Sequence, residues 1–184
     1  MLIRGHSRWH GAALVVLLLP AASAAPALAL AAEFSAASVG FAPAYETTLQ
    51  TRYGAPEVPA LRAEIVDSMT AALHAAHGDC RLTLDVVMQR AAPTHPTMKQ
   101  QLDDPALDPF RTVFYNGGAA LTGRVLDVHG QVLETVSHDH FADNRHSISP
   151  GKDPWSDARV AIGQFTQKLV SACKRQSGAS QAPH

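Results

Sequence analysis

The chain has 184 residues, enough for one domain, and its 46% hydrophobic and 17% charged residues are typical of a globular rather than a disordered protein. A formal net charge of -1 and an isoelectric point near 6.8 exclude the basic surface typical of nucleic-acid-binding proteins. The longest basic run is the pair Lys174 and Arg175, which argues against a polybasic membrane-binding patch.

Residues 1–31 have the three parts of a secretory signal peptide. Arg4 and Arg8 give a positive start, an apolar run follows over residues 12–19, and Ala-x-Ala sites occur at 27–29 and 29–31. The apolar run is far shorter than the roughly 20 residues that span a bilayer, and no cysteine near the sites offers a lipid attachment point. The sequence predicts cleavage at one of the two sites. The mature protein is then soluble, in the periplasm or outside the cell, with no membrane span.

The first half of the mature chain indicates a strand, a helix and a second strand. Small and apolar residues alternate over 34–41, and a polar stretch over 45–54 leads to a helix that begins near 56–59 and ends near Gly78. Residues 81–89 alternate between apolar and mainly polar side chains, which predicts a strand with one buried face. The apolar stripe of the helix consists of Leu61, Ile65, Met69, Leu73 and Ala76.

The second half indicates a long loop, a hairpin and a final helix. Residues 90–110 are rich in proline and read as an ordered loop with one helical turn near 98–102. Strands over 112–128 and 131–141 are joined by the turn dipeptide His129-Gly130. Asp153 and Pro154 open the last helix, whose inner face carries Ala158, Ile162, Phe165, Leu169 and Cys173. We assign residues 32–175 to a single domain and residues 176–184 to a flexible tail.

This order of elements predicts an α+β two-layer sandwich. A mostly antiparallel sheet of about four strands would carry both helices on one face. Following the strand directions along the chain brings Cys80 and Cys173 to the same end of the molecule. These are the only cysteines, and a disulfide between them is expected in an oxidising compartment. A metal pair or a reactive thiol is the weaker alternative, because the two are far apart and lie in no Cys-x-x-Cys motif.

Histidines near the end of the last strand offer one candidate metal site. Side chains two apart on a strand point the same way, with Cα atoms roughly 6.5–7 Å apart. His138 and His140 therefore have the spacing to chelate zinc, with His146, Asp143 or a neighbouring strand supplying a third ligand. The alternative is that the strand simply ends in solvated polar residues. The two histidines share the expected face of Val132 and Val136, which weakens that alternative slightly.

No catalytic signature was found in the sequence. There is no Gly-x-Ser-x-Gly elbow and no glycine-rich phosphate loop, and Asn116-Gly117-Gly118 indicates a bulge or bend within a strand. The expected disulfide would also remove a cysteine nucleophile. We therefore predict no catalytic residue and no cofactor apart from the zinc alternative, and we lean towards a protein that is not an enzyme.

Long loops on a small rigid scaffold often carry binding residues. Here the candidate loops are residues 45–53 and 93–109. Plausible contact residues in and beside them are Arg52, Tyr53, His95, Phe110 and Tyr115. The alternative is that these side chains merely cover the open face and edge of the sheet.

Short motifs along the mature chain resemble a group of bacterial secreted and periplasmic proteins of unknown function. They are Tyr53-Gly54 before Leu61-x-x-x-Ile65, Pro96-Thr97-x-x-Gln100-Gln101-Leu102, Gly117-Gly118-Ala119-x-Leu121-x-Gly123 and Trp155-Ser156-Asp157-Ala158. This resemblance implies no activity. The order of elements is also similar to that of small accessory domains of the bacterial envelope, which implies a non-enzymatic envelope protein, although fold does not fix function.

The leading expectation is therefore a non-enzymatic accessory domain that binds an envelope protein or a small ligand through its loops or its open sheet face. An apolar patch on that face would favour this hypothesis, and a fully polar face would count against it. A small metal-binding protein or metal-dependent enzyme built on His138 and His140 is the alternative. A purely structural role is not distinguished from binding by the sequence.

Overall fold

Four strands form one sheet in the order β1-β2-β3-β4. They are β1 (Ala37–Phe41), β2 (Thr83–Ala92), β3 (Gly118–Leu126) and β4 (Val132–Phe141). β1 runs parallel to β2, whereas β3 is antiparallel to both β2 and β4. The computed structural model describes residues 37–77, 79–80, 82–108, 111–114, 116–142 and 153–179, all in the unit Ala31–His184.

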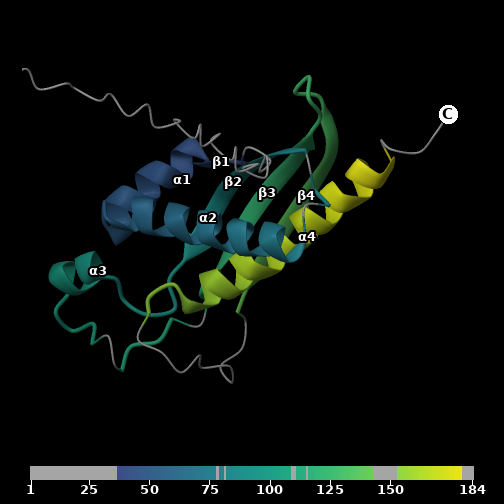
Figure 1. Cartoon of the computed structure of the whole chain (residues 1–184). Coiled ribbons are helices and arrows are strands. Elements are labelled where there is room, and N and C mark those ends of the chain that lie inside the picture. Colours follow the sequence, from purple (N-terminus) through teal and green to yellow (C-terminus); the bar gives the residue numbers. More distant parts are fainter. Residues whose placement is uncertain are drawn as a thin grey trace, which may run out of the picture. The chain divides into compact units, whose positions relative to one another are not determined.

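Two long helices cover one face of this sheet. They are α2 (Glu57–Ala75) and α4 (Ser156–Ala179), and they lie side by side in front of the strands (Figure 1). Shorter helical segments are α1 (Pro43–Thr48), the π-helical turn η1 (Leu49–Tyr53) and α3 (Met98–Asp103). The predicted α+β fold, with a mostly antiparallel sheet under two helices, is confirmed.

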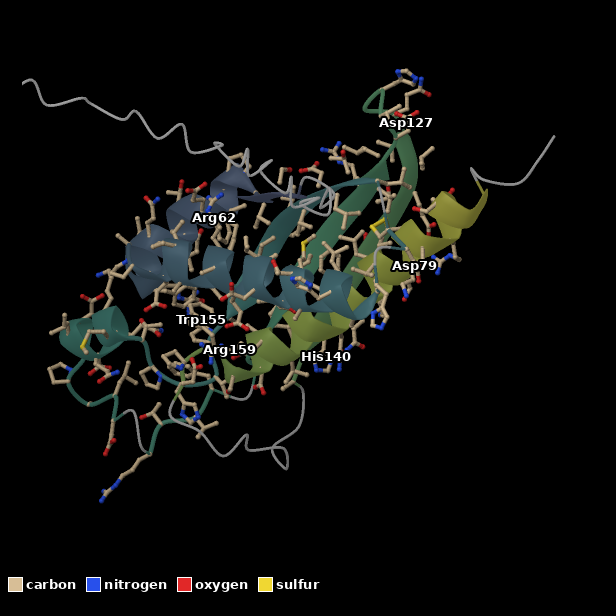
Figure 2. All side chains as sticks on the ribbon, in the orientation of Figure 1. Arg62, Asp79, Asp127, His140, Trp155 and Arg159 are labelled. Atoms are coloured by element: carbon tan, nitrogen blue, oxygen red, sulfur yellow. A yellow bond between two sulfur atoms is a disulfide. The ribbon has the colours of Figure 1, made fainter. Side chains whose placement is uncertain are left out.

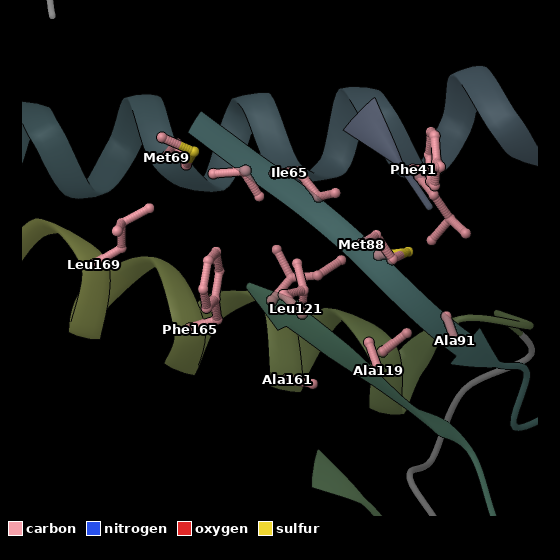
Figure 3. Close-up of a cluster of buried hydrophobic side chains, with 14 of the residues drawn as sticks. Phe41, Ile65, Met69, Met88, Ala91, Ala119, Leu121, Ala161, Phe165 and Leu169 are labelled. Atoms are coloured by element: carbon pink, nitrogen blue, oxygen red, sulfur yellow. The ribbon is translucent and has the colours of Figure 1, made fainter. Parts of the chain in front are cut away.

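The core lies between the helices and the sheet. Ile65 and Met69 of α2, Phe165 and Leu169 of α4, and Leu121 of β3 meet there, each at most 2% exposed (Figure 3). Burying one such side chain contributes about 1.5–3 kcal/mol. Leu84, Val86 and Met88 of β2 also face this core. The alternation in the sequence thus predicted the buried face of this part of β2 correctly.

Gly123 lets α4 approach the middle of the sheet. A Cβ atom at this position would lie 2.8 Å from both Leu169 Cδ2 and Phe165 Cζ, well inside normal contact distance. The glycine in the centre of β3 is therefore needed for helix packing, as expected where another part of the chain comes close to a strand.

The segment between β1 and α2 is helical, whereas the sequence pattern predicted only a polar stretch there. Tyr45, Leu49 and Tyr53 are all buried, and they recur every four residues on one side of α1 and η1. The backbone N–H of Gly54 donates to the carbonyl of Leu49 at 3.0 Å, which closes the π turn.

β3 is shorter than predicted, because the strand begins at Gly118 rather than at residue 112. A Cβ atom on Gly117 would lie 2.4 Å from Thr94 Oγ1, so Gly117 packs closely against Thr94 just before the strand begins. Gly118 has φ +150°, and a Cβ atom there would meet the backbone carbonyl of His140. The expected bend at these glycines thus marks the start of the strand.

A bulge in β4 changes one predicted face. Val125 is opposite Glu134, whereas Leu126 is opposite Val132, so Leu133 is an extra residue in β4. Val132 therefore lies on the open face of the sheet, opposite to His138 and His140. The expectation that the histidines share the face of Val132 is wrong, and it holds only for Val136.

The Cys80–Cys173 disulfide is present, with the two Cα atoms 5.3 Å apart. It joins the segment after α2 to the second half of α4, as the strand directions predicted. α4 continues through Ala179, so the first residues of the predicted tail are helical. Among the described helices, none is long and apolar enough to cross a membrane.

Candidate functional site

A cleft of about 830 Å³ opens at one end of the sheet. β2 and β4 run in the same direction, because each is antiparallel to β3, so their carboxyl ends meet at this edge. The helical segment that follows β1 and the loop before β3 close the other sides. The principal residues that line the cleft are Tyr45, Thr48, Arg52, Tyr53, Arg90, Gln100, Phe114, Asn116, Asp139, His140 and Phe141.

Two tyrosines form a fixed wall of the cleft. The Tyr45 hydroxyl donates to the backbone carbonyl of Ala91 at 3.1 Å, and burial, followed by the neighbouring Tyr53, raises the pKa of Tyr45 far above its usual value. The ring of Tyr53 packs edge-on against Trp155, with centroids 5.5 Å apart. Both side chains are therefore held in place, Tyr45 by its hydrogen bond and Tyr53 by its ring contact with Trp155.

The wall is anchored to both long helices through Trp155. Its indole Nε1–H donates to Glu57 Oε2 of α2 at 2.6 Å. One turn further along α4, Arg159 forms ion pairs with Asp153 and with Glu64, the latter at 2.8 Å. Figure 2 shows Trp155 and Arg159 between the starts of α2 and α4, so these contacts fix the helices where they support the cleft.

Arg90 and Asp139 form an ion pair across the central strand. Both are opposite Ala120 in the strand register, and Arg90 Nη2 lies 3.0 Å from Asp139 Oδ2. The Arg90 guanidinium also lies over the Phe141 ring, 4.2 Å from its centroid. The charges of Arg90 and Asp139, both of which line the cleft, therefore offset each other.

Arg52 is the second cation of the cleft. It is exposed, and its guanidinium carbon lies 5.5 Å from the centroid of the Tyr53 ring. Within the ranges that the structure describes, no carboxylate lies within ion-pair distance of Arg52. This arginine therefore has its charge available for a ligand.

The predicted contact residues do not all come together. Arg52 and Tyr53 line the cleft, whereas His95 does not. His95 is only 5% exposed, its Nδ1 is 3.1 Å from the carbonyl of Thr112, and its Nε2 has no hydrogen-bond partner among the described atoms. Phe110 and Tyr115 lie outside the described residues, and the prediction for them stays open.

The histidine pair is arranged for packing and hydrogen bonding. The rings of His138 and His140 are parallel, with centroids 6.2 Å apart. His138 Nε2 is 3.1 Å from Gln164 Oε1, and its Nδ1 is 3.0 Å from the ammonium of Lys168. Both ring nitrogens of His138 are thus already engaged with α4. Burial, followed by the Lys168 charge, lowers the pKa of His138.

Zinc binding at these histidines therefore gains no support from the geometry. In the part of the chain that the structure describes, no group of three or more His, Cys, Asp or Glu side chains is placed to hold a metal ion. His146 and Asp143, the third ligands considered, lie outside the described residues. The metal hypothesis stays a prediction.

The open face of the sheet is mainly polar. Ser38 and Arg124 both bond to Asp85, with Arg124 Nε at 2.9 Å, and these contacts, the Ser38 hydrogen bond first, lower the pKa of Asp85. The Arg90–Asp139 pair lies on the same face. A continuous apolar patch on this face would have favoured docking. The face carries charge pairs instead.

Tyr45, Arg90 and Phe141 were not named as contact residues from the sequence, although Tyr45 begins the candidate loop 45–53. The signal for Tyr45 was its four-residue spacing to Leu49 and Tyr53. Arg90 was hidden because a bulge after Met88 shifts the register, so Ala91 turns to the core and Arg90 to the open face. Simple alternation from Leu84 would have placed Arg90 towards the helices.

Comparisons of the chain with protein-family models, with curated proteins and with solved structures found no match. The residues of the cleft and their contacts are accordingly the basis on which a function can be argued.

Proposed function

We propose that this protein is a non-enzymatic binding domain, active outside the cytosol, that takes a small anionic ligand into the cleft between η1 and the carboxyl ends of β2 and β4. The observation that carries this proposal is Arg52, an exposed cation on the cleft wall without a carboxylate partner among the described residues.

The charges of the cleft favour an anion. Arg90 and Asp139 neutralise each other, so Arg52 leaves the described lining with a net positive charge. A guanidinium binds a carboxylate or a phosphate in bidentate fashion, which gives geometric specificity as well as energy. Phe141, which is partly exposed beside Arg90, offers aromatic surface for an apolar part of the same ligand.

The polar groups of the cleft are engaged in ways that suit binding rather than catalysis. Tyr45 donates to the backbone and has a raised pKa, so it is a poor general acid or base near neutral pH. Asp139 is held by Arg90, and the His140 ring is stacked on His138. A ligand in this cleft would meet fixed donors and rings, which is the arrangement of a recognition site.

The proposed location rests on the leader pattern and on the disulfide. Cys80 and Cys173, 93 residues apart, are bonded in the fold, and such a crosslink persists in oxidising compartments. Mass spectrometry of the exported protein tests the location. We expect a chain that begins at Leu30 or Ala32, after one of the two Ala-x-Ala sites. An intact amino terminus on a cytosolic protein would contradict it.

Calorimetry with three small probes tests the ligand class. Benzoate and phenyl phosphate carry an anion on an aromatic ring, whereas benzamide keeps the ring and lacks the charge. We expect Arg52→Gln to weaken binding of the anionic probes about tenfold, because one charge-assisted contact is lost. The preference between benzoate and phenyl phosphate distinguishes carboxylate from phosphate ligands.

Arg111→Gln is the matched control. Arg111 is an exposed arginine outside the cleft and is paired with Asp108 at 3.7 Å, so its loss removes the same charge from the protein without touching the lining. Equal effects of the two substitutions, or equal binding of benzamide and benzoate, would argue against an anion site at Arg52.

A further inference from the structure

A second concave surface, separate from the cleft, lies between the edge strand β4 and the helix α4. This β4–α4 groove measures about 690 Å³. One wall is the β4 segment 134–137, and the other is a single face of α4 that carries Gln164, Gln167, Lys168, Ser171 and Arg175. Figure 1 shows α4 lying over the β4 side of the sheet, with β4 as its last strand.

The outer edge of β4 presents free backbone groups. The N–H of Ala142 donates to the carbonyl of Gly117, so Ala142 points towards β3. In an antiparallel ladder, alternate residues point inward and outward. Thr135, Ser137 and Asp139 therefore direct their N–H and C=O groups away from β3. Among the described strands none pairs with this side, because β4 ends the sheet.

Two side chains of β4 that face α4 form polar contacts with this helix, one at each end of the groove. Glu134 is bonded to Arg175 and to Gln176, and His138 is bonded to Gln164 and Lys168.

Val136 lies between Glu134 and His138 and is partly buried against the core. Val136 thus gives the groove an apolar floor between two polar ends.

The two cations of the groove differ in their partners. Arg175 is paired with Glu134 at 2.6 Å. Lys168, in contrast, contacts the His138 ring at 3.0 Å and has no ion-pair partner among the described carboxylates. An incoming carboxylate would find one unpaired positive charge beside the apolar floor.

We propose that the β4–α4 groove binds an extended segment of a partner protein that adds to the sheet as a strand next to β4. Strand addition at an open edge gives affinity through main-chain hydrogen bonds, while pockets for alternate side chains give specificity. One small apolar side chain of the segment lies on Val136. The next side chain in the same row, two residues along the segment, carries an Asp or Glu carboxylate to Lys168.

This inference goes beyond the proposed anion site and does not depend on it. The two surfaces share no lining residue: the cleft uses Asp139, His140 and Phe141 of β4, whereas the groove uses residues 134–137.

NMR of the mature protein tests the proposal with two pools of acetylated, amidated heptapeptides. Both pools have Val at the third position, a fixed fifth residue and Thr, Val and Ser mixtures elsewhere. One pool has Glu at the fifth position and the other has Lys. We expect the Glu pool to shift the amide signals of Thr135, Ser137 and Asp139 and to slow their hydrogen exchange. The Lys pool should bind at least about tenfold more weakly.

Ser137→Pro blocks the edge, because proline has no N–H and an edge position tolerates it when that N–H faces solvent. Ser137→Ala is the matched control, since it keeps the N–H. We expect Ser137→Pro to weaken binding of the Glu pool about tenfold and Ser137→Ala to leave it unchanged. Lys168→Glu should reverse the preference so that the Lys pool binds better, and this substitution leaves the strand intact.

The proposal is overturned if neither pool slows exchange in β4, if Ser137→Pro binds as well as Ser137→Ala, or if Lys168→Glu leaves the preference unchanged. It is also overturned if the protein alone forms a dimer that Ser137→Pro dissociates, because the edge would then be occupied by a second copy. A loss of anionic-probe binding in the cleft would not affect any of these outcomes.

Discussion

At the scale of single residues, Gly123 shows how one position sets the distance between layers. Gly123→Ala places a methyl group 2.8 Å from the ends of Leu169 and Phe165, two side chains without free space in the core. We expect the substitution to lower the free energy of unfolding by about 1–3 kcal/mol, the usual cost of overpacking. Urea denaturation of the mature protein measures it.

Gly163→Ala is the contrasting change. Gly163 lies within α4, and a Cβ atom there would have nothing within 4 Å. We expect alanine to raise the free energy of unfolding by up to about 1 kcal/mol through helix propensity. A pair of variants that changed stability in the same direction would contradict the close packing of α4 on β3.

His138 gives the structure a defined pH response. Burial and the Lys168 ammonium lower the pKa of His138 in the folded protein. As pH falls below about 6.5, the usual histidine value, the unfolded chain takes up this proton before the folded chain does, so this group makes the protein less stable on acidification. Above that pH it has no effect.

An NMR titration of the His138 ring tests this assignment. Lys168→Gln should raise the pKa of His138, because it removes the second largest of the three causes that lower it, after burial and ahead of the neighbouring His140. An unchanged or lower pKa in the variant would show that the ammonium is not held against the ring.

At the scale of elements, α3 is fixed to η1 by one buried threonine. The Thr97 hydroxyl donates to the carbonyl of Tyr53 at 2.8 Å, and the same oxygen accepts from the N–H of Gln100 in the capping box of α3. We expect Thr97→Ala to cost about 1–2 kcal/mol and to weaken binding of anionic probes in the cleft, because η1 positions Arg52. Thr97→Ser, which retains the hydroxyl, should behave like the wild type in both measurements.

The elements that sequence reasoning placed correctly are those with strong periodicity. The stripe Leu61, Ile65 and Met69 identifies α2, and the alternation from Leu84 to Met88 identifies β2. The α1–η1 helix was missed because its exposed face is rich in threonine, which obscures a stripe of only three buried residues.

The cleft itself could not be predicted from local pattern. Arg90 reaches it only because of the bulge in β2, and Asp139 and Phe141 reach it only through the register of β4 on β3. Neither bulge leaves a distinct mark in the sequence. Of the contact residues named from the sequence, Arg52 and Tyr53 line the cleft, as does His140, which was named as a metal ligand. Arg52 and Tyr53 lie next to a glycine turn, where a binding loop is expected.

At the scale of the whole molecule, the disulfide closes the two-layer fold. Cys80 and Cys173 are separated by 93 residues in sequence and lie 5.3 Å apart between Cα atoms. Replacing both with alanine should lower the free energy of unfolding by about 4–5 kcal/mol, the chain-entropy value for a loop of this length. Urea denaturation of the oxidised, reduced and double-alanine proteins measures the loss. Equal stability of all three would contradict a structural role for the bond.

The proposed ligand site is the cleft at the carboxyl ends of β2 and β4. The most direct test is an amide chemical-shift map recorded while benzoate is added to the mature protein. We expect the largest shifts to fall on Arg52, Tyr53, Ala91 and Phe141, to disappear in Arg52→Gln and to persist in Arg111→Gln. Shifts that cluster elsewhere in the described fold, or that survive loss of Arg52, would contradict it.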